Sequence, residues 1–184
     1  MAYLFGLPGN DQTLDHAPKF KRRLDRHIRR AKNIVLVGWR PTPDGVRLFD
    51  AMSPRAAKTL VEAWPSNCER FSYRDTEVVC GDIREYDSLP FAKCGMLIWQ
   101  DGPEHVVKEE VVPLIMRMQE DFNAIVLSTP DGEHPQEALE GNPWEIHRST
   151  WREEDYERLG FQVCKYNAGL LGFWERGHES PFFR

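Results

Sequence analysis

Short apolar runs, each followed by a polar or amphipathic stretch, set the pattern of this chain. Five runs rich in valine, isoleucine and leucine predict buried parallel strands at 33–38, 58–63, 76–80, 95–100 and 124–129. Two further strands are expected at 161–166 and 170–175. Only Asn167, Ala168 and Gly169 separate these two strands, and so short a link permits only an antiparallel hairpin.

The stretches between the strands predict helices. Apolar side chains recur at helical spacing from Val107 to Phe122, and Pro113 lies among them, where we expect a kink or a restart. Ser149 or Thr150 is expected to cap a helix that runs through residue 159, because an acidic turn follows them. Shorter helices are expected at 44–52 and 65–71.

This order of elements predicts one α/β domain of the Rossmann-like type. We expect a seven-stranded, mostly parallel sheet that ends in an antiparallel β-hairpin and carries helices on both faces. A length of 184 residues suits a single domain, with an N-terminal segment at 1–32 and a core at 33–175.

Composition excludes several classes of protein. Apolar residues make up 41% of the chain and charged residues 29%, as in an ordinary soluble domain rather than a disordered or fibrous one. No apolar run approaches the roughly 20 residues of a membrane span, and the N-terminus lacks the pattern of a secretory signal.

The four cysteines show no metal-like spacing. We interpret them as reduced thiols, which fits a cytoplasmic protein.

One segment departs from the net charge of −5. Eight Lys or Arg residues fall between Lys19 and Lys32, while Phe20, Leu24 and Ile28 recur at helical spacing, so we expect an amphipathic helix with a basic outer face. That face could bind an anionic partner such as RNA, or could be a solvated surface beside the sheet. We expect no membrane partner, and the sequence leaves the oligomeric state open.

Two polar clusters built around Asp-Gly follow the fourth and fifth expected strands. Their members include Asp101, Glu104, His105, Asp131 and His134. In an open α/β sheet, ligands bind beyond the carboxyl ends of the parallel strands. The sequence therefore predicts a binding site at this edge of the sheet.

Several segments resemble the class I S-adenosylmethionine-dependent methyltransferases, most closely a prokaryotic subset of them. They are Asp101 to His105, Thr129-Pro130-Asp131-Gly132, Asn142-Pro143-Trp144 with His147, and Trp151 with Asp155-Tyr156. The resemblance covers about residues 33–175 and is specific in its second half. It implies S-adenosylmethionine as the cofactor and methyl transfer as the reaction.

The resemblance places the cofactor at the ends of the first four strands. Glu62 is expected to bind the ribose hydroxyls, and Asp82, followed by Ile83, to lie near the adenine. Gly38 and Trp39 follow the first strand. Trp99 ends the fourth strand, near the methionine part of the cofactor. Other interpretations stay open, because Glu62 could be a surface acid and Asp82 a turn former. The three tryptophans Trp39, Trp64 and Trp99 could stack on a ligand or fill the core.

The glycine loop departs from the family pattern of an acidic residue followed by three alternate glycines. Arg40 stands where the second glycine would be, and Pro41 and Pro43 remove two amide donors.

Two functions therefore stay open. One is a methyltransferase acting on a small molecule; the other is a methyltransferase-fold scaffold or binding module that has lost its cofactor. A third hypothesis, an RNA methyltransferase, depends on the basic helix.

Methyl transfer needs proximity and orientation first, and a general base if the nucleophile carries a proton. His105 is the preferred base, with Asp101 as the second catalytic candidate. His105 could instead cap or pack the following helix, and His134 and His147 are weaker candidates. We predict no metal site, because the spacing of Glu104 and the three histidines matches no ligand motif.

Overall fold

The structure is a computed structural model, which describes residues 18–38, 52–73, 75–166 and 169–177. The helix expected at 44–52 falls outside these residues except for Met52. Trp39, Arg40 and the rest of the glycine loop after Gly38 also fall outside them.

The described residues form a seven-stranded sheet in the order β3-β2-β1-β4-β5-β7-β6. The strands β1 to β5 are parallel, and β7 runs antiparallel to both β5 and β6. The predicted sheet and its terminal hairpin are therefore confirmed. The bounds are β1 Asn33–Val37, β2 Ala57–Glu62, β3 Thr76–Cys80, β4 Met96–Trp99, β5 Ala124–Pro130, β6 Gln162–Tyr166 and β7 Gly169–Glu175.

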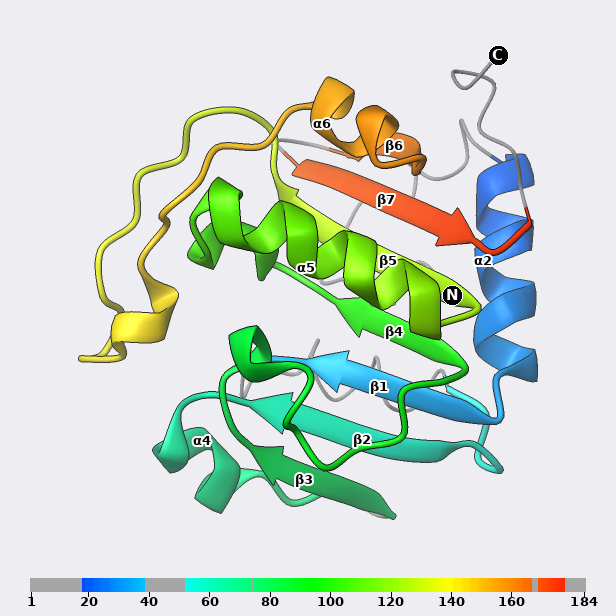
Figure 1. Ribbon diagram of the computed structural model, residues 1–184, viewed down its shortest axis with the longest axis horizontal. Helices are drawn as coiled ribbons and strands as arrows, with labels where there is room; N and C mark the ends of the chain where they lie inside the picture. Colours follow the sequence, from blue (N-terminus) through cyan, green and yellow to red (C-terminus); the bar gives the residue numbers. More distant parts are fainter. Residues whose placement is uncertain (1–17, 39–51, 74, 167–168, 178–184) are drawn as a thin grey trace.

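Helices pack against side chains of both faces of this sheet, and Figure 1 shows α5 lying across one of these faces. Because side chains alternate along a strand, Ile34 and Leu36 of β1 pack on one face with the apolar side of α2. Val35 and Val37 point to the other face and pack in a cluster with α5. The helices are α2 Pro18–Arg30, α4 Pro65–Arg70, α5 Lys108–Asp121 and α6 Glu153–Arg158, with short 3₁₀ turns η1 Ile83–Glu85, η2 Pro103–His105 and η3 Pro143–Glu145.

The basic helix forms as the sequence predicts. Phe20, Leu24 and Ile28 of α2 are buried in the core. On its flank, Arg23 and His27 both pair with Glu175, the last residue of β7. The carboxylate of Glu175 is partly desolvated, which opposes ionisation, but its interactions with Arg23 and His27 outweigh this effect and lower its pKa. The helix is thus fixed to one end of the hairpin.

Two local expectations about helices need correction. The helix α5 runs from Lys108 through Pro113 as one helix, so the restart expected at Pro113 is absent, while the alternative of a kink stays a prediction. The helix α6 begins later than expected, because Trp151 is buried and held by a backbone bridge to Gly132. Instead of a cap from Ser149 or Thr150, the Arg152 N–H donates to the Asp155 carboxylate at 2.9 Å.

The interpretation of all four cysteines as reduced thiols is also wrong. Cys68 of α4 and Cys80 of β3 form a disulfide, while Cys94 and Cys164 are free. The two bonded cysteines are 12 residues apart, a spacing that carries no motif. The thiol argument for a cytoplasmic protein therefore does not hold for this pair. Among the described helices, none is both long and apolar enough to cross a membrane.

Candidate functional site

The carboxyl ends of the parallel strands meet at one edge of the sheet. Val37 of β1 lies in register with Val61 of β2 and with Trp99 of β4, and Trp99 lies beside Leu127 of β5. The residues that follow these strands therefore share this edge, on the side toward which the arrows of β1 to β4 point (Figure 1). This is where the sequence predicts the site.

Gly38 follows β1 and provides an open backbone position. Its φ is +77°, a conformation that side chains rarely adopt, and its N–H donates to the Val61 carbonyl at 2.8 Å. Among the described residues, none has an atom within 4 Å of a Cβ atom placed on Gly38. None of the described residues therefore prevents a ligand from approaching the backbone here.

Glu62 ends β2 and is only 5% exposed. Its Oε1 accepts a hydrogen bond from the Trp64 N–H at 2.8 Å, which fixes the side chain at the strand end. The Glu62 carbonyl accepts from the Gly81 N–H at 2.9 Å, so β2 and the turn after β3 are joined here. The interpretation of Glu62 as an exposed surface acid is therefore wrong.

Asp82 and Ile83 lie in the turn after β3. The Asp82 carboxylate accepts from the Arg84 N–H at 2.9 Å and from the Arg84 Nε at 2.7 Å. These bonds support the interpretation of Asp82 as a turn former. Ile83 is 6% exposed and packs in the core cluster that contains Val61 and Trp99.

Trp99 is part of the core. It is 3% exposed, and its indole lies against Gly102, where a Cβ atom would come within 1.8 Å of Nε1. The core interpretation therefore holds for this tryptophan. Trp64 is partly buried, and Trp39 lies outside the described residues.

Asp101 lies in the turn after β4, at the same edge of the sheet. It has a positive φ of 43° although it is not a glycine. Its N–H donates to the Ser128 Oγ at 3.0 Å, and that hydroxyl donates back to Asp101 Oδ1 at 3.2 Å. The end of β5 thus holds the turn after β4 in place.

His105 lies in η2, next to Glu104, and is partly buried. Its Nδ1 faces the Ile146 carbonyl at 3.3 Å, and its ring meets that of His147 edge to face at 4.9 Å between centroids. Burial lowers the pKa of His105 most, and His147 lowers it further. The carbonyls of Ile146 and Asp101 and the Glu145 charge act in the opposite direction. The net shift is downward, so this imidazole is neutral near pH 7.

A pocket of about 280 Å³ opens beside these residues. Its walls are the segments after β5 and before α6, and Glu104 contributes to its lining. The lining residues are Glu104, Pro130, Gly132, Glu133, His134, Pro135, His147, Arg148, Ser149 and Thr150. The structure therefore brings His134 and His147 to one cavity. Asp101 and His105 lie at the same edge of the sheet but do not line this cavity.

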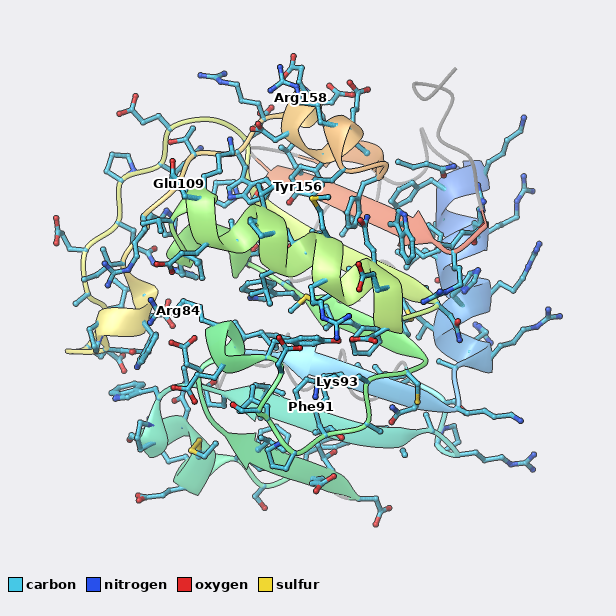
Figure 2. The ribbon with its side chains drawn as sticks, viewed as in Figure 1. Arg84, Phe91, Lys93, Glu109, Tyr156 and Arg158 are labelled. Atoms are coloured by element: carbon cyan, nitrogen blue, oxygen red, sulfur yellow. A yellow bond between two sulfur atoms is a disulfide. The ribbon has the colours of Figure 1, made fainter. Side chains whose placement is uncertain are left out.

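The loop from β5 to α6 is held by contacts of its own. The Gln136 side chain donates to the Glu145 carbonyl at 2.6 Å, and the His147 N–H donates to the Gln136 carbonyl at 3.1 Å. At the far end of this loop, the Trp144 ring lies with its centroid 5.3 Å from the guanidinium of Arg84. Figure 2 shows Arg84 beside the loop that carries η3. The loop therefore spans the edge from β5 toward β3.

Solved structures similar to this chain are methyltransferases or a domain with a bound methyltransferase product. The N-terminal domain of EvdMO1 with SAH bound has a TM-score of 0.59 at 14% identity, with 85% of this chain and 79% of that chain covered. The small RNA methyltransferase HEN1 has a TM-score of 0.59 at 15% identity, with 89% and 26% covered. An S-adenosylmethionine-dependent methyltransferase from Clostridium acetobutylicum has a TM-score of 0.55 at 8% identity, with 93% and 94% covered.

No family model matches the sequence, and no curated protein matches it. The structural likeness and the strand order together define the fold as that of the class I S-adenosylmethionine-dependent methyltransferases. The fold that the sequence resemblance implied is thus confirmed.

Proposed function

We propose that this chain is an S-adenosylmethionine-dependent methyltransferase that acts on a small-molecule acceptor. The observation that carries the proposal is the pairing of an open Gly38 with a buried Glu62 at neighbouring strand ends. The first lets a ligand approach the backbone, and the second presents a fixed carboxylate that can accept hydrogen bonds from a ribose diol. The SAH bound to the EvdMO1 domain supports this choice of cofactor.

The reaction needs little covalent participation from the protein. An acceptor atom forms a bond to the methyl carbon while the bond from that carbon to sulfur breaks. The electron pair of the broken bond stays on sulfur, so the sulfonium becomes a neutral thioether, and a proton leaves the acceptor. The protein contributes orientation and a means of removing that proton. Asp101 and His105 are the proposed catalytic residues because they lie on the acceptor side of the edge.

The position of the basic helix favours a small acceptor over RNA. Arg23 and His27 of α2 pair with Glu175, and Glu175 lies opposite Ala124, the first residue of β5. The basic helix therefore lies at the edge where the parallel strands begin, away from the candidate site (Figure 1). An anionic partner bound there would not lie over the pocket. The described residues that line the pocket include two glutamates and one arginine, so this lining has no excess of basic side chains to attract a phosphate backbone.

The alternative of a scaffold that has lost its cofactor gains no support from the described residues. Trp99 is buried under Gly102 as part of the core, and no described residue lies within 4 Å of a Cβ atom placed on Gly38. The described residues therefore do not fill the cofactor position in place of a ligand.

Replacing Glu62 by glutamine tests the proposal. Glutamine keeps an oxygen for the Trp64 N–H but removes the charge. Because a hydrogen bond to a charged group contributes about 1.5–3 kcal/mol, the affinity for S-adenosylhomocysteine should fall roughly ten- to a hundredfold. Isothermal titration calorimetry on the full chain measures this affinity.

The matched control is Glu77→Gln, which removes an exposed carboxylate from the middle of β3. Its affinity for S-adenosylhomocysteine should equal that of the unmodified chain. Equal affinity in Glu62→Gln as well would show that Glu62 does not hold the ribose.

A further inference from the structure

One carboxylate and two imidazoles meet on the acceptor side of the candidate site. Glu104 and His105 are neighbours in η2, and His147 comes from the loop before α6. One possible ligand atom from each residue lies within 4.8 Å of the others. Glu104 is 3% exposed, and the two histidines are partly buried. Side chains of these types are common ligands of divalent transition metals.

The backbone holds these three residues together. The N–H groups of Arg148 and Ser149 both donate to the Glu104 carbonyl, at 2.7 and 3.0 Å. The Ser149 hydroxyl also donates to the Pro103 carbonyl at 3.3 Å. The segment that carries His147 is therefore fixed against η2 by three hydrogen bonds, so the cluster does not depend on flexible side chains alone.

The hydrogen bonds of the two rings determine which nitrogens can bind a metal ion. Nδ1 of His147 contacts the His134 carbonyl, and Nδ1 of His105 faces the Ile146 carbonyl. A carbonyl only accepts, so Nδ1 is the donor in these two contacts, and Nε2 is the nitrogen of each ring that we assign as the metal ligand. Metal-binding histidines in proteins typically have their second nitrogen bonded to a carbonyl or a carboxylate in this way.

We propose that Glu104, His105 and His147 bind one divalent transition metal ion beside the pocket. Imidazole ligands favour ions such as Zn²⁺, Co²⁺ or Mn²⁺ over Ca²⁺, which prefers oxygen ligands alone. Three protein ligands leave at least one coordination position, as in catalytic metal sites. Since Glu104 and His147 both line the pocket of about 280 Å³, a ligand in the pocket can reach that position.

The proposed metal site adds detail to the proposed methyltransferase function, and its role in catalysis depends on that function. A hydroxyl group loses its proton near neutral pH far more readily when its oxygen binds such an ion. The acceptor class that this chemistry fits is an alcohol, whose proton would pass to water in the pocket before the oxygen attacks the methyl carbon. His105 then acts by holding the ion rather than by taking the proton.

The expectation of no metal site was based on sequence spacing. Spacing identifies ligands only when they share one helix or one loop. Here Arg148 and Ser149 bring His147 to Glu104 through backbone bonds between segments distant in the sequence. No local motif records such a contact.

Titration of the full chain with Co²⁺ tests the site, because a protein-bound Co²⁺ ion gives an absorption spectrum that reports its ligands. We expect one ion per chain, displaced by Zn²⁺. His147→Ala and Glu104→Gln should each weaken binding at least about tenfold, since even indirect metal contacts contribute that much. His27→Gln is the matched control, because His27 lies on α2 and pairs with Glu175. It should bind Co²⁺ as the unmodified chain does.

Melting temperatures without metal show which variants fold. If Glu104→Gln is unfolded, metal binding by folded His147→Ala still tests the site. An unmodified chain that binds no Co²⁺ or Zn²⁺ at millimolar concentration would overturn the proposal, and so would equal binding by folded His147→Ala. Titration of the same samples with S-adenosylhomocysteine separates the two proposals. Metal binding without cofactor binding would contradict the methyltransferase function alone, and cofactor binding without metal binding would contradict the metal site alone.

Discussion

At the scale of single residues, the turn after β4 depends on close packing between Trp99 and Gly102. A Cβ atom on Gly102 would lie 1.8 Å from Nε1 and 2.0 Å from Cδ1 of the Trp99 indole. The indole is 3% exposed and cannot move into solvent without opening the core. Gly102 therefore lets η2, with Glu104 and His105, approach the end of β4.

Gly102→Ala should lower the free energy of unfolding by about 1–3 kcal/mol, because it overpacks the core at this contact. Denaturant unfolding measures the loss. In a Trp99→Phe background, where the indole nitrogen is absent, the cost of Gly102→Ala should shrink. An equal cost in both backgrounds would mean that the contact with Trp99 is not the cause.

Individual site residues differ in how far the sequence predicts them. Glu62 could be placed because its strand is a local apolar run, and the acid comes directly at its end. Asp82 could be placed at the edge, but its bonds to Arg84 could not, because a turn former and a ligand carry the same residue type. The contact of His147 with His105 depends on the path of a long loop, which no local pattern records.

At the scale of elements, the disulfide between Cys68 and Cys80 joins α4 to the end of β3. The Sγ atom of Cys68 lies 3.4 Å from the Glu62 carbonyl oxygen. The disulfide thus lies beside the strand end that carries Glu62, on the side of the proposed ribose site. Its Cα–Cα distance is 6.0 Å. Cysteine spacing could not predict this pair, because Cys68 of α4 and Cys80 of β3 become neighbours only when the chain folds.

Replacing both cysteines by serine should lower the free energy of unfolding by roughly 2–3 kcal/mol, as expected for a disulfide that closes a short loop. Cys94→Ser, which changes an exposed free cysteine, should change stability by less than about 0.5 kcal/mol. Thiol titration of the denatured chain checks the bond itself. Two thiols should react before reduction and four afterwards, since Cys94 and Cys164 are free. Four reactive thiols before reduction would contradict the disulfide.

At the scale of the whole molecule, the two edges of the sheet differ. The edge where β1 to β4 end carries Gly38, Glu62 and the acceptor-side residues. The opposite edge carries the end of β7 and, beside it, the basic helix α2. The seven strands and the terminal hairpin could be predicted from the sequence, because each parallel strand is a separate apolar run and the short link fixes the last two. Their order in the sheet comes from the structure, since an apolar run does not indicate which strands it pairs with. The placement of α2 at the opposite edge depends on the Glu175 pairs, which the sequence alone does not indicate.

The most direct test of the central claim is calorimetric titration of the full, unmodified chain with S-adenosylhomocysteine. The open backbone at Gly38 and the fixed carboxylate of Glu62 predict saturable binding of one molecule per chain, with a rise in melting temperature because the ligand binds only the folded state. No heat and no thermal shift at millimolar ligand would contradict the proposed methyltransferase function.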